Sequence, residues 1–130
     1  MPLVTIVNQT SRSMNARNIA SWVLTVLLGI AFCLIGVSKI SGMSADMFVE
    51  WGYPAWFARV IGVVEAVGAL LLVVPKTMRF GVYLLTAVMV GAAATHLLNG
   101  EAIQILRPAA FGGALWLALS LRKVEPLAAA

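Results

Sequence analysis

The chain has 130 residues, of which 62% are hydrophobic and 11% are charged, and its formal net charge is +4. Soluble domains average about 45–50% apolar and about 25% charged residues, so this composition excludes an ordinary water-soluble domain. The low charge argues against disorder, and the single cysteine, Cys33, excludes an internal disulfide framework.

Four apolar runs are long enough to cross a bilayer, which needs roughly 20 apolar residues per helix. They are residues 19–40, 56–74, 80–98 and 103–121, and together they contain only four formal charges. The links between the second, third and fourth runs are short, so sequential helices must be antiparallel neighbours. We predict an all-α integral membrane protein, an up-down four-helix bundle over residues 19–121, with residues 1–18 and 122–130 as cytoplasmic tails.

Charge on the links predicts the orientation of the bundle in the membrane. One side carries six cations, and the other carries three acidic residues; the cations are Arg12, Arg17, Lys76, Arg79, Arg122 and Lys123, and the acids are Asp46, Glu50 and Glu101. Basic residues are enriched in cytoplasmic loops. We therefore expect both termini in the cytoplasm, and we explain the net positive charge by topology, without a nucleic-acid partner.

The link between the first and second runs, residues 41–55, is the longest. Its apolar residues follow at helical spacing, between a candidate N-cap and a Gly-Tyr-Pro stop; they are Met43, Met47, Phe48 and Trp51, with Ser44 as the cap and Gly52-Tyr53-Pro54 as the stop. We predict a short amphipathic helix on the outer surface. Two roles stay open, a lipid-facing interfacial helix and a lid over the bundle.

Small residues are expected on the faces where membrane helices meet, because helices in lipid associate by close approach. Such residues recur along three of the runs: Gly62, Ala66 and Ala69 in the second, Gly91 and Thr95 in the third, and Ala110, Ala114 and Ala118 in the fourth. We expect these positions to be structural.

Glu65 is the least expected residue in the runs. It is the ninth residue of the second run, roughly 13 Å below the outer end at about 1.5 Å per residue, near the midplane of a ~30 Å core. An ionised side chain there costs about 2.5–3.5 kcal/mol, so Glu65 must be neutral, paired or hydrated. Arg107, about 6 Å below the outer rim, can reach it. Lys39 would have to point steeply inward, and we expect it to extend to the surface.

These positions place all the polarity that needs an explanation in the outer half of the bundle. We predict a polar pocket there, with Glu65 at its floor and Lys39, Arg59, His96 and Arg107 around its wall, since an intramembrane ionisable residue indicates a functional site. Two structural explanations remain open: an ion pair between Glu65 and Arg107 that fixes helix register, and an interfacial hydrogen bond from His96. One His and one buried Glu are too few for a zinc or di-iron site, so no metal is expected.

Several short motifs resemble the DoxX-like family of small four-helix membrane proteins. They are Gly36-Val-Ser-Lys39, Gly52-Tyr-Pro54, Arg59-Val-Ile-Gly62-Val-Val-Glu65-Ala-Val-Gly68, Pro75 and Thr95-His96, within roughly residues 20–121. The resemblance implies a multi-pass protein of the bacterial cytoplasmic membrane, with Lys39 and Glu65 as the polar positions of the family. Family members in quinone-linked redox complexes imply a similar system here, and animal relatives resemble assembly chaperones.

Three functions are compatible with this sequence, and they leave open whether the protein is an enzyme. The first is a subunit of a membrane redox or quinone-linked system that binds a small lipophilic molecule, such as a quinone, with proton transfer at Glu65 and a redox partner subunit or a second copy. The second is a non-catalytic assembly or scaffold protein. The third is an isomerase or cyclase of a lipophilic substrate, with Glu65 and His96 as acid and base.

Overall fold

The computed structural model is helical, and it describes the backbone of residues 2–122 and the side chains of residues 16–122. Five α-helices and one 3-10 turn follow in chain order: α1 (Pro2–Ile40), α2 (Ala45–Glu50), α3 (Phe57–Val73), α4 (Met78–Leu98), η1 (Ala102–Ile105) and α5 (Leu106–Arg122). No strand occurs within residues 2–122. The all-α class predicted from the sequence is confirmed.

Three helical stretches are long and apolar enough to cross a membrane: Ala16–Ile40, Met78–Leu98 and Ala102–Arg122. Helix α3, with 17 residues, is shorter than these stretches and is not among them. The helices therefore support a membrane protein and correspond to three of the four predicted spans.

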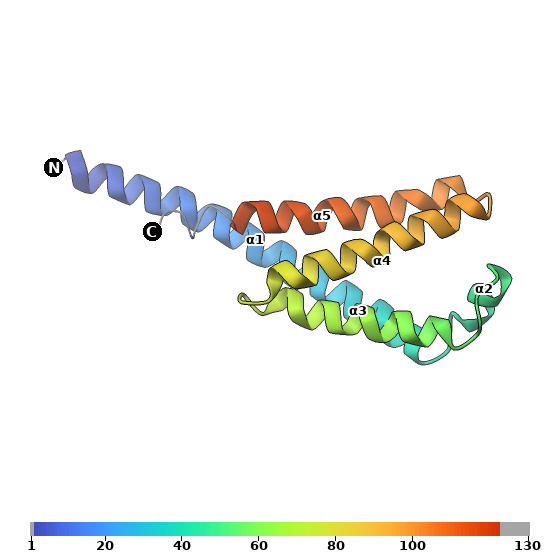
Figure 1. The fold of residues 1–130 in the computed structure, drawn as a ribbon. Helices are drawn as coiled ribbons and strands as arrows, with labels where there is room; N and C mark the ends of the chain where they lie inside the picture. Colours follow the sequence, from blue (N-terminus) through green and yellow to red (C-terminus); the bar gives the residue numbers. More distant parts are fainter. Residues whose placement is uncertain (1, 123–130) are drawn as a thin grey trace.

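Two helix ends differ from the prediction. Helix α1 begins at Pro2, so residues 2–18, predicted as a tail, continue directly into the first apolar run. Figure 1 shows this part of α1 projecting beyond the other helices. Helix α5 begins at Leu106, because the residues from Ala102 to Ile105 form a 3-10 turn. The side chain of Arg12 and residues 123–130, including Lys123, lie outside the described part of the chain.

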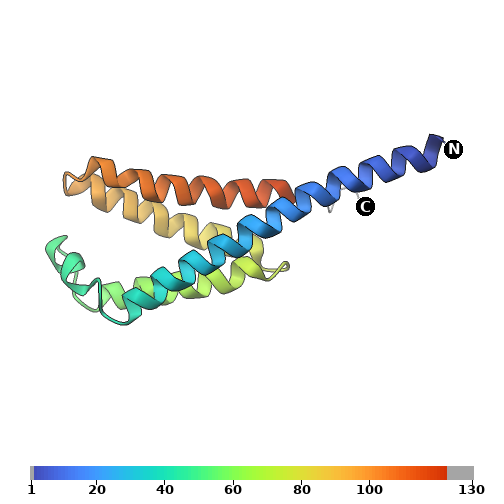
Figure 2. The same cartoon turned by 180° about the vertical axis from the view of Figure 1, so that it is seen from behind.

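The four longer helices pack as two pairs. Helix α1 packs against α3 and α5, and α4 packs against the same two helices. Figures 1 and 2 show that the pairs α1–α3 and α4–α5 lie close together near the α3–α4 link and separate toward the end that carries α2. We call the end with the α3–α4 link the inner end, and the end with α2 and η1 the outer end.

The buried apolar core lies between the middle of the helices and the inner end. Its members come from all four longer helices: Leu28, Phe32, Ala69, Leu72, Met78, Val82, Leu85, Leu115, Ala118 and Leu119. Phe32 and Phe111 extend it toward the outer end, with ring centroids 5.2 Å apart. Closely packed helices make more dispersion contacts with one another than they make with lipid tails. This core therefore holds the two helix pairs together at one end.

Helices α1 and α3 cross through two glycines. A Cβ atom at Gly62 would lie 2.5 Å from the carbonyl oxygen of Gly36, and one at Gly36 would lie 2.7 Å from the carbonyl oxygen of Gly62. A similar approach joins α3 to α4, where a Cβ at Gly81 would lie 2.9 Å from the carbonyl oxygen of Gly68. Only glycine permits backbones to approach this closely.

The predicted stripes of small residues are confirmed in part. Gly62 and Ala69 of α3 and Ala118 of α5 are buried. A Cβ atom at Gly91, in contrast, would meet no neighbouring element within 4 Å, and Ala110 is exposed. Among the described residues, those two positions do not mark helix contacts.

The inner end also contains polar groups that the sequence analysis did not expect. Ser21 and Thr25 are fully buried on α1. Ser21 Oγ donates to the carbonyl oxygen of Ala118 at 2.8 Å, and Thr25 Oγ1 donates to that of Ser21 at 2.6 Å. Arg122 donates to Thr25 Oγ1 at 3.2 Å and lies over the Trp22 ring at 4.0 Å. Placing all the polarity in the outer half was wrong, because hydroxyl groups can bond to helix carbonyls within an apolar run.

Candidate functional site

The site begins with a buried ion pair between α1 and α3. Nζ of Lys39, near the end of α1, donates to Oε1 of Glu65 in the middle of α3. The Glu65 side chain is 0% exposed and that of Lys39 is 20% exposed. Lys39 therefore points inward to the carboxyl group, and the expectation that it extends to the surface is wrong.

The glycine crossing explains why these two side chains meet. Gly36 lies three residues before Lys39, and Gly62 lies three residues before Glu65, so each glycine shares a helix face with the charged residue. A Cβ at Gly62 would lie 2.8 Å from Cβ of Lys39, and one at Gly36 would lie 3.4 Å from Cβ of Glu65. Each glycine thus makes room for the charged residue of the opposite helix.

The carboxyl group of Glu65 is only half satisfied. Its Oε1 accepts from Lys39, while Oε2 is buried and has no hydrogen-bond partner among the described residues. A buried acceptor without a donor loses the hydrogen bonds it made in water and gains none in return. Oε2 is therefore an atom to which a bound molecule can donate.

The ion pair between Glu65 and Arg107, which the sequence left open as a structural explanation, is not found among the described residues. Arg107 and Arg59 are both exposed, and within residues 16–122 the ion pair of Glu65 is with Lys39. Arg107 lies in the first turn of α5, at the outer end, where the α4–α5 pair has moved away from α1–α3. Arg107 and Glu65 are close in depth along their helices, but the separation of the two helix pairs keeps their side chains apart.

An aromatic cluster lies beside the ion pair, on the side of α2. Phe48 of α2 is buried, and its ring centroid lies 5.3 Å from that of Trp51, 5.9 Å from that of Tyr53 and 6.1 Å from that of Phe57. Nζ of Lys39 lies 5.9 Å from the Phe48 centroid, within the range of a cation–π interaction. The cluster therefore contacts the cation that holds Glu65.

Helix α2 lies within the first link, where the short amphipathic helix is predicted, and its position at a membrane surface stays a prediction. Ser44 occupies the N-cap position, but its side chain makes no capping hydrogen bond. Phe48 is turned inward, while Met43 and Met47 are 80% and 50% exposed. One face of α2 thus packs on the protein, and the other presents apolar side chains outward.

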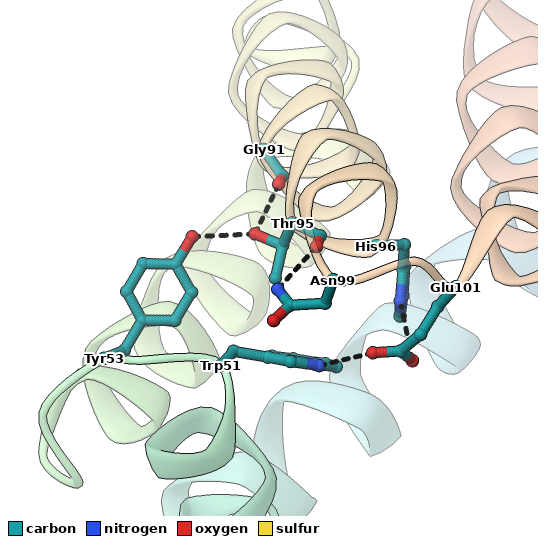
Figure 3. A network of polar contacts seen from close by, with 7 residues as sticks. All are labelled: Trp51, Tyr53, Gly91, Thr95, His96, Asn99 and Glu101. Carbon is teal, nitrogen blue, oxygen red and sulfur yellow. Dashed lines mark hydrogen bonds and ion pairs between the residues drawn. The ribbon is translucent and has the colours of Figure 1, made fainter.

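A second polar cluster joins the segment after α2 to the end of α4 (Figure 3). Trp51 Nε1 donates to Oε1 of Glu101 at 2.7 Å. The hydroxyl groups of Tyr53 and Thr95 are 2.7 Å apart, and Thr95 Oγ1 also donates to the carbonyl oxygen of Gly91 at 2.8 Å. Because the Thr95 hydroxyl has one proton, Tyr53 is the donor to Thr95. We call these residues the outer network.

His96 belongs to the outer network. Its ring meets that of Trp51 edge-on, with centroids 5.2 Å apart, and its Nδ1 lies 3.4 Å from Oε2 of Glu101. Nδ1 is buried and makes no hydrogen bond to a described residue. No hydrogen bond or ion pair among residues 16–122 joins His96 to Glu65. Of the predicted site residues, Lys39 and Glu65 form the ion pair, His96 belongs to the outer network, and Arg59 and Arg107 are exposed.

Sequence reasoning missed four members of the outer network, because each had a simpler explanation. Trp51 and Tyr53 fit an aromatic belt at the membrane surface, Thr95 fits a stripe of small residues, and Glu101 fits a charged loop. One sequence feature could have predicted the network. The link before α3 has two aromatic residues that can donate hydrogen bonds, Trp51 and Tyr53, and the link after α4 has an acceptor, Glu101. Among the described residues, no group of three His, Cys, Asp or Glu side chains could hold a metal ion.

Comparison with known proteins agrees with the resemblance seen in the motifs. The model of the DoxX-like family matches residues 23–119. This range includes the Lys39–Glu65 ion pair, the aromatic cluster and the outer network. No match was found among curated proteins or among solved structures.

Proposed function

This chain belongs to the DoxX-like family, and we propose that it is a four-span membrane protein that binds a small lipophilic molecule at the Lys39–Glu65 ion pair. One observation carries the proposal: a fully buried carboxyl group has one oxygen bonded to Lys39 and the other without a partner among the described residues. Ionisable residues inside a membrane are costly and mark functional sites. A ligand that donates a hydrogen bond to Oε2 would complete the site.

Helix α3 is the fourth span in this proposal. Its 17 residues equal the lower limit of about 17 for a transmembrane helix, and it packs between α1 and α4. Arg17, Lys76, Arg79 and Arg122 belong to the inner end, and Asp46, Glu50 and Glu101 to the outer end. By the positive-inside rule, the inner end and both termini face the cytoplasm of a bacterial cell.

Cysteine labelling tests this orientation. In a Cys33→Ala background, Asp46→Cys should react with a membrane-impermeant maleimide on intact cells, because residue 46 is exposed at the outer end. Lys76→Cys, exposed in the α3–α4 link, should react only after the cells are permeabilised. The opposite pattern of labelling would contradict the proposed orientation.

We favour a quinone as the lipophilic molecule and a membrane redox complex as the setting. A quinone accepts protons when it is reduced, and a quinol donates hydrogen bonds through its hydroxyl groups, for which Glu65 Oε2 is a suitable acceptor. Electrons would come from a redox partner subunit. The role of Glu65 is to accept or donate the proton, and Lys39 holds its carboxyl group in place.

Removing the charge of Glu65 tests the site. Glu65→Gln keeps the shape of the side chain, but it replaces one carboxylate oxygen, a hydrogen-bond acceptor, with an NH2 group, which is a donor. We expect binding of a short-chain ubiquinone, measured by quenching of tryptophan fluorescence in the purified protein, to weaken about tenfold or more. Glu50→Gln, on the exposed side of α2, is the matched control and should bind like the wild type. Unchanged binding by Glu65→Gln would remove Glu65 from the site.

A second candidate function, assembly or scaffolding without catalysis, is favoured by the glycine crossing. The ion pair lies beside Gly36 and Gly62, so it would fix the register of α1 against α3, a role known for buried polar pairs. A scaffold would bind a partner subunit or a second copy. In that case Glu65→Gln should lower stability and leave ubiquinone binding unchanged.

A further inference from the structure

We infer that residues 45–56, which comprise α2 and the turn after it, form a gate over the Lys39–Glu65 ion pair, and that Trp51 and Tyr53 latch this gate to the outer end of α4. The proposed function requires a path to Glu65, whose side chain is 0% exposed. The path must open through whatever covers the ion pair. The contacts of the segment identify that cover.

Phe48 contacts Lys39, and Lys39 in turn contacts Glu65. Phe48 is 7% exposed and lies 5.9 Å from Nζ of Lys39, and the same Nζ contacts Glu65 Oε1. Moving Phe48 away would further expose the Lys39 side chain, which is 20% exposed while Phe48 is in place. Lys39 could then turn toward water, which would uncover the carboxyl group.

The segment is attached to a helix pair other than its own. Residues 45–56 connect α1 to α3, yet the side chains of Trp51 and Tyr53 bond to Glu101 and Thr95, at the end of α4 and the link that follows it. The two helix pairs separate toward this end (Figures 1 and 2). The segment therefore bridges the pairs where their backbones are far apart, and the two side-chain hydrogen bonds complete the bridge (Figure 3).

Phe48 is the buried residue of the segment 45–56, and the other residues are intermediate or exposed. Glycines with positive φ stand on either side of α2, Gly42 at 93° and Gly52 at 94°, a conformation that glycine adopts without strain. Phe48 is the buried residue of α2. A short element with one buried side chain opens more readily than the packed core, so the latch bonds contribute a large share of what keeps it closed.

Chemical modification of Glu65 tests the gate. A water-soluble carbodiimide adds to the carboxyl group to form an O-acylisourea. The amine of glycine ethyl ester or of the adjacent Lys39 then displaces the urea and leaves an amide. Mass spectrometry detects both products, the modified Glu65 peptide and the Lys39–Glu65 cross-linked peptide. The reagent reaches Glu65 only when the cover opens. The rate of modification in the wild-type protein in detergent is the reference.

Loss of either latch bond should speed this modification. Trp51→Phe removes the indole N–H, and Tyr53→Phe removes the hydroxyl group while keeping the ring that stacks on Phe57. We expect the rate to rise about three- to tenfold in each variant, the change produced by the loss of one hydrogen bond. Tyr83→Phe, on the exposed face of α4, should leave the rate unchanged. Equal rates in all four proteins would overturn the gate.

A cross-linked protein provides the opposite test. In a Cys33→Ser background, Tyr53→Cys and Thr95→Cys can be bridged by dibromobimane, which ties the segment to α4. Bridging should slow the modification of Glu65 relative to the same protein before bridging, and an unchanged rate would overturn the gate.

The gate rests on the proposed function, but the two can fail separately. The rate of modification measures the access of a reagent to Glu65, whereas quenching of tryptophan fluorescence by ubiquinone measures ligand binding. Faster modification in the latch variants together with unchanged binding by Glu65→Gln would keep the gate and reject the binding site. Weaker binding by Glu65→Gln with equal modification rates would do the reverse.

Discussion

The inner and outer ends of this molecule are held together by different interactions. At the inner end, apolar side chains from four helices pack against each other, and several of them are completely buried, including Leu72, Leu85 and Leu115. At the outer end, the contacts between the helix pairs are polar or aromatic, as in the bonds from Trp51 to Glu101 and from Tyr53 to Thr95. The two ends therefore differ in the chemistry of the contacts that hold them.

This difference explains where a site can lie in a small membrane protein. Lipid tails are as apolar as leucine, so helices stay together through close packing and through hydrogen bonds. A packed core leaves no room for a ligand, whereas hydrogen bonds can be broken and remade one at a time. The ion pair between Lys39 and Glu65 lies between the packed core and the hydrogen-bonded outer end. It is next to the glycine crossing and to the aromatic cluster.

The largest expected effect comes from breaking the ion pair on one side. Lys39→Met removes the cation and leaves the Glu65 carboxyl group buried without its partner. We expect the free energy of unfolding, measured by denaturation in mixed micelles, to fall by about 3–5 kcal/mol. Lys76→Met, exposed in the α3–α4 link, is the matched control and should change it little.

The double substitution Lys39→Met with Glu65→Met sharpens this comparison. Replacing both partners of a buried ion pair with apolar residues is often neutral or stabilising, so we expect most of the lost stability to return. Recovery of stability in the double variant would indicate that the ion pair is not needed for stability and would favour a functional role. If the double variant stayed as unstable as Lys39→Met, the pair would be part of the structural framework.

Truncation of a core residue at the inner end should have the next largest effect. Leu115 is 0% exposed, and Leu115→Ala would leave a cavity between the helix pairs. We expect a loss of about 2–4 kcal/mol in the free energy of unfolding. Leu98→Ala, at a side chain that is 83% exposed, should change it by less than about 0.5 kcal/mol. Similar losses in both variants would contradict the location of the core.

A smaller effect is expected at the crossing between the two ends. Gly62→Ala places a Cβ 2.5 Å from the Gly36 carbonyl oxygen, so α1 and α3 must move apart. We expect a loss of about 1–3 kcal/mol in the free energy of unfolding. Gly91→Ala, in open space on α4, should be neutral or slightly stabilising, since alanine favours helix. A neutral Gly62→Ala would mean that the crossing tolerates a wider separation.

The helices and the deep position of Glu65 could be predicted from the chain, but the partners of each polar residue could not. Helical periodicity and depth placed Glu65 among several cations at the same level, and by depth Arg107 was the better partner. The family resemblance pointed to Lys39 instead. Which cation reaches the carboxyl group depends on the separation of the helix pairs, which hydropathy does not record.

The sequence determined the helical class, the apolar runs and the placement of a carboxyl group deep within one of them, because composition and hydropathy are properties of consecutive residues. The tertiary structure decided that Lys39 pairs with Glu65 and that Arg107 stays exposed. It also decided that Trp51 bonds to Glu101 and Tyr53 to Thr95. These contacts join residues far apart in the chain. They follow from how the helices cross and rotate, which is set by close approaches such as the one between Gly36 and Gly62.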